Sequence, residues 1–137
     1  MFCIDERIQS TSFLLGDWPL SRVFLKNEDS YPWFILVPRR ENIQEIHQLV
    51  KEERQILMEE INQLSLIVKD NFKTDKLNIG ALGNVVSQLH IHVIARNKKD
   101  TLWPQGLWQS SMNSTPYEEQ RLNKLLPDLQ ELIRSYI

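Results

Sequence analysis

The stretch Gln88-Leu89-His90-Ile91-His92-Val93-Ile94-Ala95-Arg96 carries the clearest structural pattern in the chain. Successive side chains of a β-strand point to opposite faces of the sheet, so every second residue shares a face. One face of such a strand is wholly apolar, because it is made by Leu89, Ile91, Val93 and Ala95. The opposite face carries Gln88, His90 and His92 within contact reach of one another. The stretch therefore predicts a strand that packs on a helix through one face and presents two neighbouring histidines on the other.

Three explanations account for two neighbouring histidines on a sheet. In the first explanation, the histidines are simply hydrogen-bonded or exposed polar residues on an open antiparallel face, where polar side chains are expected. Alternatively they bind zinc, which needs a third or fourth ligand; only His47, Cys3 and carboxylates are available, and His47 has no paired ligand at a metal-like spacing. The third explanation is chemistry on phosphorus, since a neutral imidazole with a pKa near about 6.5 is a good nucleophile. His92 then stands where a second donor is needed.

The segments before this strand predict a hairpin and a long helix. Residues 21–26 alternate as a strand, residues 27–30 supply turn chemistry, and residues 33–37 form a second apolar strand that ends at Pro38. Apolar residues recur at helical spacing between about Lys51 and Phe72. A further strand is expected over residues 76–81, followed by a loop around Gly83 and Asn84. Hairpins with separate helices indicate an α+β fold with an antiparallel sheet.

The two ends of the chain both read as helices. Residues 4–15 predict a short amphipathic helix through Ile4, Ile8 and Leu15, which residues 16–19 terminate. Residues 103–113 look irregular. A closing helix is expected from Pro116 to about residue 135, because Thr115 and Glu118 have the spacing of a capping box and proline fits the first helical position.

Size and composition restrict the class of protein. The 137 residues predict one domain, residues 1–137, with an ordinary globular composition of 42% hydrophobic and 25% charged residues. The formal net charge of -2 argues against binding long nucleic acids, which requires a basic face. Cys3 is the single cysteine, so no intramolecular disulfide forms and a reducing, cytoplasmic location is expected. No stretch has the length and apolarity of a membrane span.

The histidine strand resembles the signature of the histidine-triad (HIT) family, in which three histidines alternate with apolar residues and the middle one is the nucleophile. The three positions here hold Gln88, His90 and His92. The preceding residues 83–87 resemble the family's phosphate-contacting glycine loop, and residues 23–40 resemble its opening pair of strands. The similarity covers most of residues 20–108. It implies a HIT-like α+β fold, with an antiparallel sheet of about five strands, a long helix and a C-terminal helix.

The resemblance also implies roles for individual residues. His90 is expected to attack the α-phosphorus, His92 to donate to a phosphate oxygen, and Gln88 to orient the His90 ring through its amide. Gly83 and Asn84 are expected to hold the phosphate through backbone amides. Asn27 matches a position that often binds the ribose hydroxyls, although a turn-forming asparagine explains it equally well.

The chain departs from the family pattern at three positions. Gln88 replaces the first histidine and cannot carry a proton. Val85 lacks the hydroxyl that usually helps to hold the phosphate. Glu41 stands where a histidine often follows the Pro-basic-basic stretch. These departures leave two hypotheses open: a nucleotide hydrolase or nucleotidyl transferase, and a nucleotide-binding module without useful catalysis.

The leading hypothesis is an enzyme that cleaves a phosphoanhydride or phosphoramidate at the α-phosphate through a nucleotidyl-histidine. Its substrate is expected to be a purine nucleotide or other nucleoside phosphate, of the dinucleoside polyphosphate or phosphoramidate type. No cofactor is required and no metal site is predicted, but a divalent cation could neutralise polyphosphate charge. The family resemblance implies a homodimer. Trp103 and Trp108 either cover the nucleotide site, cross to a second subunit, or fill core space at the sheet edge.

Overall fold

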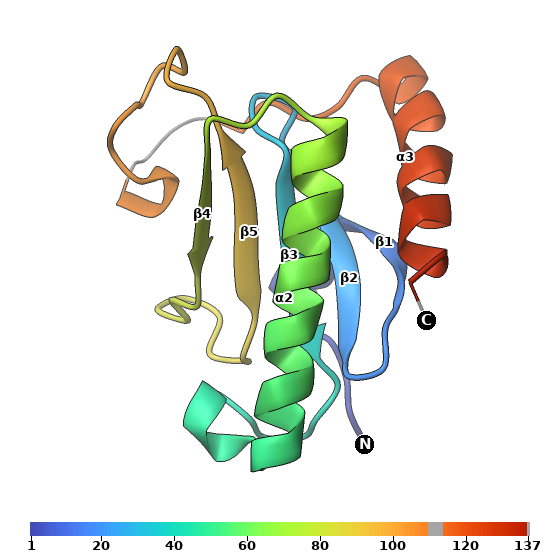
Figure 1. The fold of residues 1–137 in the computed structure, drawn as a ribbon, viewed down its shortest axis with the longest axis vertical. Helices are drawn as coiled ribbons and strands as arrows, with labels where there is room; N and C mark the ends of the chain where they lie inside the picture. The colour runs from blue at the N-terminus through green and yellow to red at the C-terminus, as the bar shows by residue number, and fades with distance from the viewer. Residues whose placement is uncertain (110–113, 137) are drawn as a thin grey trace.

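A computed structural model describes residues 1–109 and 114–136 and contains a five-stranded antiparallel sheet in the order β1-β2-β3-β5-β4 (Figure 1). The expected α+β architecture is confirmed. Residues 110–113, part of the segment predicted to be irregular, lie outside the described residues. The helical and strand elements are α1 (Glu6–Gln9), β1 (Ser12–Asp17), β2 (Ser21–Lys26), β3 (Trp33–Pro38), η1 (Ile46–Gln48), α2 (Lys51–Asn71), β4 (Lys76–Gly80), β5 (Ile91–Arg96), η2 (Leu107–Gln109) and α3 (Glu119–Arg134).

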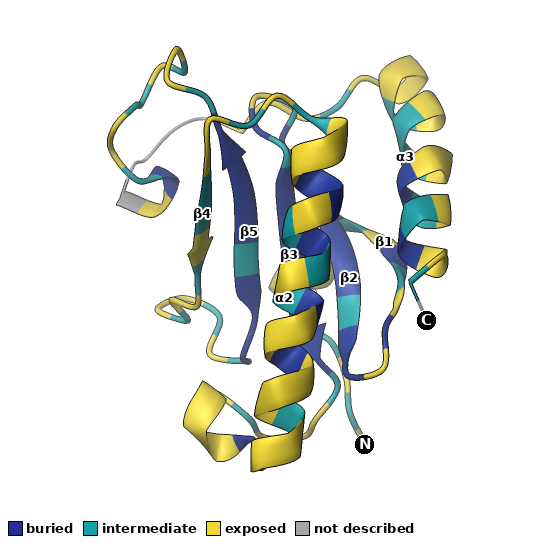
Figure 2. Cartoon of the chain, in the orientation of Figure 1, coloured by how far each residue is buried: buried dark blue, intermediate teal, exposed yellow. Residues whose placement is uncertain are grey.

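Helices α2 and α3 cover one face of the sheet. In Figure 1, α2 lies in front of the central strands and runs along them, and α3 lies beside β1. The side of α2 that faces the sheet is buried while its outer side is exposed (Figure 2), as its apolar periodicity predicts. The alternate residues of the histidine strand join this core, since Leu89, Ile91, Val93 and Ala95 all pack in it. None of the described helices is long and apolar enough to cross a membrane.

The opposite face of the sheet carries the histidines. Phe24 pairs with Ile35, Ile35 with His92, and His92 with Gly80, so these four residues form one row across four strands. Phe24 and Ile35 belong to a second apolar cluster on this face, together with Trp33 and Ile94. The alternation predicted from the sequence therefore separates the two faces, and His92 lies on the face that α2 does not cover.

The predicted helix over residues 4–15 is wrong. Only Glu6–Gln9 is helical, and Ser12–Asp17 forms β1, an edge strand that pairs with β2. Within β1, Phe13 and Leu15 face the core and Leu14 is exposed, which is the alternation of a strand. The hydrogen bonds to β2 and the core contacts outweigh the weak helical spacing of a short segment.

Two elements begin later than predicted, because backbone groups near their expected starts form hydrogen bonds with other segments. Strand β5 begins at Ile91 rather than Gln88, since the Leu89 amide donates to the Ile43 carbonyl of a loop. Helix α3 begins at Glu119, and Glu118 makes no capping hydrogen bond with its side chain. Residues 115–117 are instead held by the turn after β2.

Glu60 connects α2 to the start of β2 and gives the fold a pH dependence. Its buried carboxylate accepts a hydrogen bond of 2.9 Å from the Leu20 amide. Burial raises the pKa of Glu60 above its ordinary value of 4.5, although the amide hydrogen bonds oppose this. The folded state therefore keeps a proton at pH values where the unfolded chain has lost it, so stability falls as pH rises through that interval.

We expect Glu60→Gln to remove this loss. Denaturant unfolding of wild type and Glu60→Gln at several pH values between about 4 and 8 measures the effect. The exposed neighbour Glu59 provides the control, because Glu59→Gln changes the same charge on the same helix without a buried carboxylate. Parallel stability curves for wild type and Glu60→Gln would contradict the assignment.

Candidate active site

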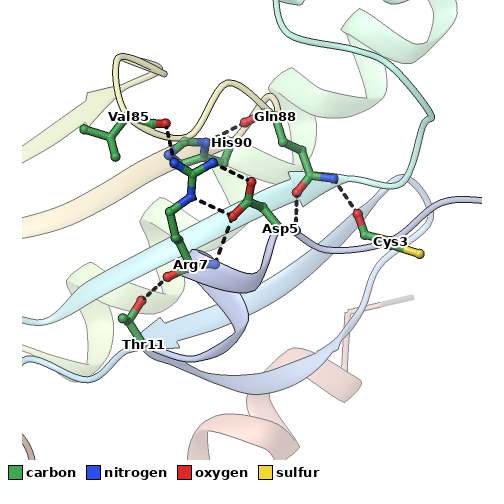
Figure 3. Close-up of polar contacts among 7 residues, drawn as sticks. All are labelled: Cys3, Asp5, Arg7, Thr11, Val85, Gln88 and His90. Carbon is green, nitrogen blue, oxygen red and sulfur yellow. Dashed lines mark hydrogen bonds and ion pairs between the residues drawn. The ribbon is translucent and has the colours of Figure 1, made fainter.

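His90 lies immediately before β5, and its hydrogen bond defines which ring nitrogen is free. The side chain is buried, with 7% of its surface exposed. Its Nδ1 atom lies 2.6 Å from the main-chain oxygen of Gln88 (Figure 3). A carbonyl oxygen can only accept, so Nδ1 carries the hydrogen of the neutral ring. The lone pair of His90 is consequently on Nε2, where a nucleophile needs it.

His92 has the opposite arrangement. The indole N–H of Trp33 donates to His92 Nδ1 over 2.9 Å, and an indole can only donate. Nδ1 is therefore unprotonated, and the hydrogen of the neutral ring is on Nε2. Burial lowers the pKa of His92 to about 3, with further contributions from His90 and Lys26. His92 is a neutral hydrogen-bond donor at physiological pH.

The two rings form a matched pair. Their centroids are 4.8 Å apart in an edge-to-face arrangement. One ring offers an unprotonated nitrogen and the other an N–H group, which are the two groups needed to attack a phosphorus atom and to bind one of its oxygens. The expected positions of His90 and His92 are thus brought together by the fold.

Gln88 acts on His90 through its backbone, not its side chain. The expectation that its amide orients the His90 ring is wrong, because the contacting atom is the main-chain oxygen. The side chain instead contacts the N-terminal segment: Nε2 donates to the Cys3 carbonyl over 2.7 Å, and Oε1 accepts from the Asp5 amide over 2.9 Å.

The N-terminal segment, residues 3–7, is a component of the site that the sequence did not predict. Figure 3 shows Arg7 between Asp5 and the loop that precedes His90. Its guanidinium pairs with both carboxylate oxygens of Asp5 and donates to the Val85 carbonyl over 2.9 Å. Arg7 holds the pKa of Asp5 below its ordinary value. The contacts of this segment with Val85 and Gln88 span about eighty residues, so no local signal in the sequence predicts them.

The loop expected to hold phosphate has the geometry of a tight turn. Gly83 has a φ of 72°, in the left-handed region that favours glycine. Asn84 and Val85 follow it on the surface, with exposed side chains. The loop therefore leads directly from an exposed turn to the buried His90.

Asn27 is engaged elsewhere. Its side-chain oxygen accepts a hydrogen bond of 2.9 Å from the Tyr117 amide and so attaches the segment before α3. Within residues 1–109 and 114–136, no hydrogen bond joins Asn27 to His90 or His92. Whether Asn27 binds a ribose or only forms a turn, its side-chain oxygen also holds the Tyr117 amide.

Aromatic rings surround His92. Trp33 packs edge-on at 5.7 Å between ring centroids, and Trp108 lies at 6.2 Å and is 36% exposed. The Lys26 ammonium lies 4.6 Å from the centre of the Trp33 ring. Trp103 packs against the Arg96 guanidinium. Of the two tryptophans considered from the sequence, Trp108 borders the candidate site, whereas Trp103 contacts Arg96 at the end of β5.

Metal coordination has no support in the geometry of the described part of the chain. There, no group of three or more histidine, cysteine or acidic side chains is close enough to hold an ion. His47 is exposed in η1, more than forty residues before the histidine pair in the sequence.

Comparison with known proteins identifies the family. The HIT domain family model matches residues 7–99, which include the loop and both histidines. The chain belongs to the HIT domain family. The resemblance seen in the sequence is therefore confirmed, and no curated protein matches the chain.

Solved HIT proteins match over nearly the whole chain. A histidine triad protein from Marinobacter aquaeolei is 38% identical with a TM-score of 0.94, covering 100% of this chain and 99% of that one. One from Bradyrhizobium japonicum is 37% identical with a TM-score of 0.90, covering 96% and 98%. One from Sinorhizobium meliloti is 35% identical with a TM-score of 0.89, covering 95% and 96%. The HIT fold of this chain is thus shared from end to end with these proteins.

Proposed function

We propose that this HIT domain is a nucleotide hydrolase or nucleotidyl transferase acting at the α-phosphate of a nucleoside phosphoanhydride or phosphoramidate. The observation that carries the proposal is the hydrogen bond between His90 Nδ1 and the Gln88 carbonyl, which leaves the Nε2 lone pair free beside the N–H of His92. A nucleophile of this kind is unnecessary for binding alone.

The reaction proceeds in two displacements. The Nε2 lone pair of His90 forms a bond to the α-phosphorus, and the bond from phosphorus to the leaving group breaks. The positive charge that develops on the His90 ring is stabilised by the Gln88 carbonyl at Nδ1. Water or another acceptor then attacks the phosphorus and releases its proton to the solvent, and the electron pair of the P–N bond returns to Nε2. The His92 N–H stabilises charge on a phosphate oxygen in both transition states.

Backbone amides around Gly83 and Asn84 are proposed to hold the remaining phosphate oxygens, since the exposed turn allows close approach. No cofactor takes part in these steps. A divalent cation assists by neutralising a polyphosphate substrate, and a cytoplasmic location agrees with the single free cysteine, Cys3.

A homodimer is also proposed. Strand β4 lies at the edge of the sheet, and Ile79 on it is exposed. Helix α2 exposes three further apolar side chains, Ile56, Met58 and Leu66. Pairing of two copies would cover these groups, since an unpaired edge strand and exposed apolar groups favour association.

A nucleotide-binding module without useful catalysis is the second candidate. It is favoured by the Gln88 side chain, whose amide oxygen and nitrogen each bind the N-terminal segment, and by Val85, which offers no hydroxyl to a phosphate. Both candidates predict nucleotide binding, so only the covalent step separates them.

Intact-protein mass spectrometry after brief mixing tests that step. We expect an adenylyl adduct and released AMP when wild type is mixed with diadenosine polyphosphate or an adenosine phosphoramidate. Both signals should be absent in His90→Ala and present in His47→Ala, which removes an exposed histidine as a matched control. Binding of AMP without adduct or turnover on either substrate would support the binding module instead.

A further inference from the structure

The contact between Trp33 and His92 restricts what the leaving group can be, if the proposed function holds. Trp33 is buried on β3, where it pairs with Ile94 of the neighbouring strand β5. Its indole N–H is the hydrogen-bond partner of His92 Nδ1 at 2.9 Å. An indole has no acceptor to offer, so a proton on Nδ1 would face another N–H and lose this bond.

Neighbouring charges reinforce the same state. Lys26 on β2 lies over the Trp33 ring, and His90, immediately before β5, lies beside His92. Of the two acidic residues in the N-terminal segment, Glu6 is exposed, and Asp5 has both of its oxygens bound by Arg7. Burial lowers the pKa of His92, and the charges of His90 and Lys26 act in the same direction.

We propose that Trp33 is a positioning residue that fixes His92 as a neutral donor at Nε2, and that the site therefore selects leaving groups that depart without a proton. Phosphate groups satisfy this condition, because a phosphoanhydride releases a stable phosphate anion. Amines and alcohols do not, because they leave as strong bases unless an acid protonates them.

The balance of the first step makes the distinction explicit. The Nε2–P bond forms from the His90 lone pair, and the P–O bond breaks with its electrons moving to the bridging oxygen. That oxygen becomes part of a phosphate anion and requires no proton. In a phosphoramidate the electrons move to nitrogen, which needs a proton that neutral His92 is too weak an acid to give. Gln88, at the first histidine position, cannot supply it either.

The tautomers are measured directly by long-range ¹H–¹⁵N correlation spectra of the imidazole rings. We expect His92 to be protonated at Nε2 with no titration between about pH 5 and 8, and His90 to be protonated at Nδ1 when neutral. Trp33→Phe should convert His92 to a mixture of tautomers. Trp18→Phe is the matched control, because it also removes a buried indole hydrogen bond, to the Ile133 carbonyl at 2.8 Å, on the opposite face of the sheet. A titrating His92, or one protonated at Nδ1 in wild type, would overturn the role given to Trp33.

Selectivity is measured by kcat/KM for adenylyl substrates that differ only in the leaving group. General acid catalysis contributes about 10²- to 10⁴-fold, so without it we expect the anhydride to exceed the phosphoramidate by about 100-fold or more. Lys26→Met tests whether the Lys26 ammonium, which lies over the Trp33 ring, protonates the leaving group in place of His92. Equal rates on the two substrates, or phosphoramidate cleavage that disappears in Lys26→Met, would overturn the proposal while leaving the His90 mechanism intact. Absence of turnover on both substrates would instead contradict the proposed function, and the spectra would still decide the tautomer of His92.

Discussion

Replacing His90 with glycine is expected to lower kcat by roughly four to six orders of magnitude, which is the scale seen when a covalent nucleophile is removed. The loss is this large because His92 cannot replace the nucleophile: its Nδ1 is bound by Trp33 and its Nε2 carries hydrogen. Affinity for AMP, measured by calorimetry, should change little. The measurement is initial-rate kinetics with diadenosine polyphosphate.

Added imidazole should restore part of the lost rate in His90→Gly, because the small ring can enter the space that the side chain leaves. His47→Gly is the control, since it removes an exposed imidazole and should neither lose activity nor respond to imidazole. A His90→Gly variant that retains wild-type turnover would remove His90 as the nucleophile.

Replacing Asp100 with alanine is expected to destabilise the fold by about 3–5 kcal/mol, the usual cost of leaving one member of a buried ion pair without its partner. Arg96, at the end of β5, is fully buried and bound by both oxygens of Asp100 at 2.8 and 3.0 Å. Asn78 accepts one further hydrogen bond from Arg96 but carries no charge. Denaturant unfolding measures the loss.

The pair of Arg121 and Asp29 is a matched control with the same 2.8 Å separation but an exposed arginine. We expect Asp29→Ala to cost about 0–1 kcal/mol. Hydrogen bonds from Arg96 hold the pKa of Asp100 below its ordinary value of 3.8. The stability that Asp100 contributes should therefore be complete above that value and decline as pH falls through the lower, folded-state pKa. Similar losses for Asp100→Ala and Asp29→Ala would contradict the role given to burial.

The elements with strong periodicity were predictable, and those that depend on distant partners were not. Helix α2 and the hairpin β2–β3 lie where their apolar spacing places them. The segment from Ser12 to Asp17 has only six residues and forms a strand because β2 offers it an edge. Helix α3 likewise begins later than predicted because of distant partners. The Thr115 and Tyr117 amides donate hydrogen bonds to the Glu28 and Asn27 side chains in the turn after β2.

The candidate site divides in a similar way. Alternation along one strand was enough to place His90 and His92 together, because neighbours two residues apart on a strand must share a face. It was not enough to define their protonation, which depends on what each Nδ1 meets. The Gln88 carbonyl and the Trp33 indole belong to different parts of the chain, and Gln88 is itself held by residues 3–5.

The sequence by itself thus determined the family, the antiparallel sheet and the histidine pair, because each follows from local periodicity or from a short motif. Only the tertiary structure decided which nitrogen of each histidine carries the hydrogen. It also decided how the N-terminal segment contacts the loop before His90, and that the ion pair of Arg96 and Asp100 is buried. The contacts of Trp33 with His92 and of Arg7 with Val85 join groups tens of residues apart. The His90–Gln88 and Arg96–Asp100 contacts are close in the sequence, but only the packed structure buries them. Packing of the whole domain brings these hydrogen-bonding groups together, and local sequence patterns do not predict it.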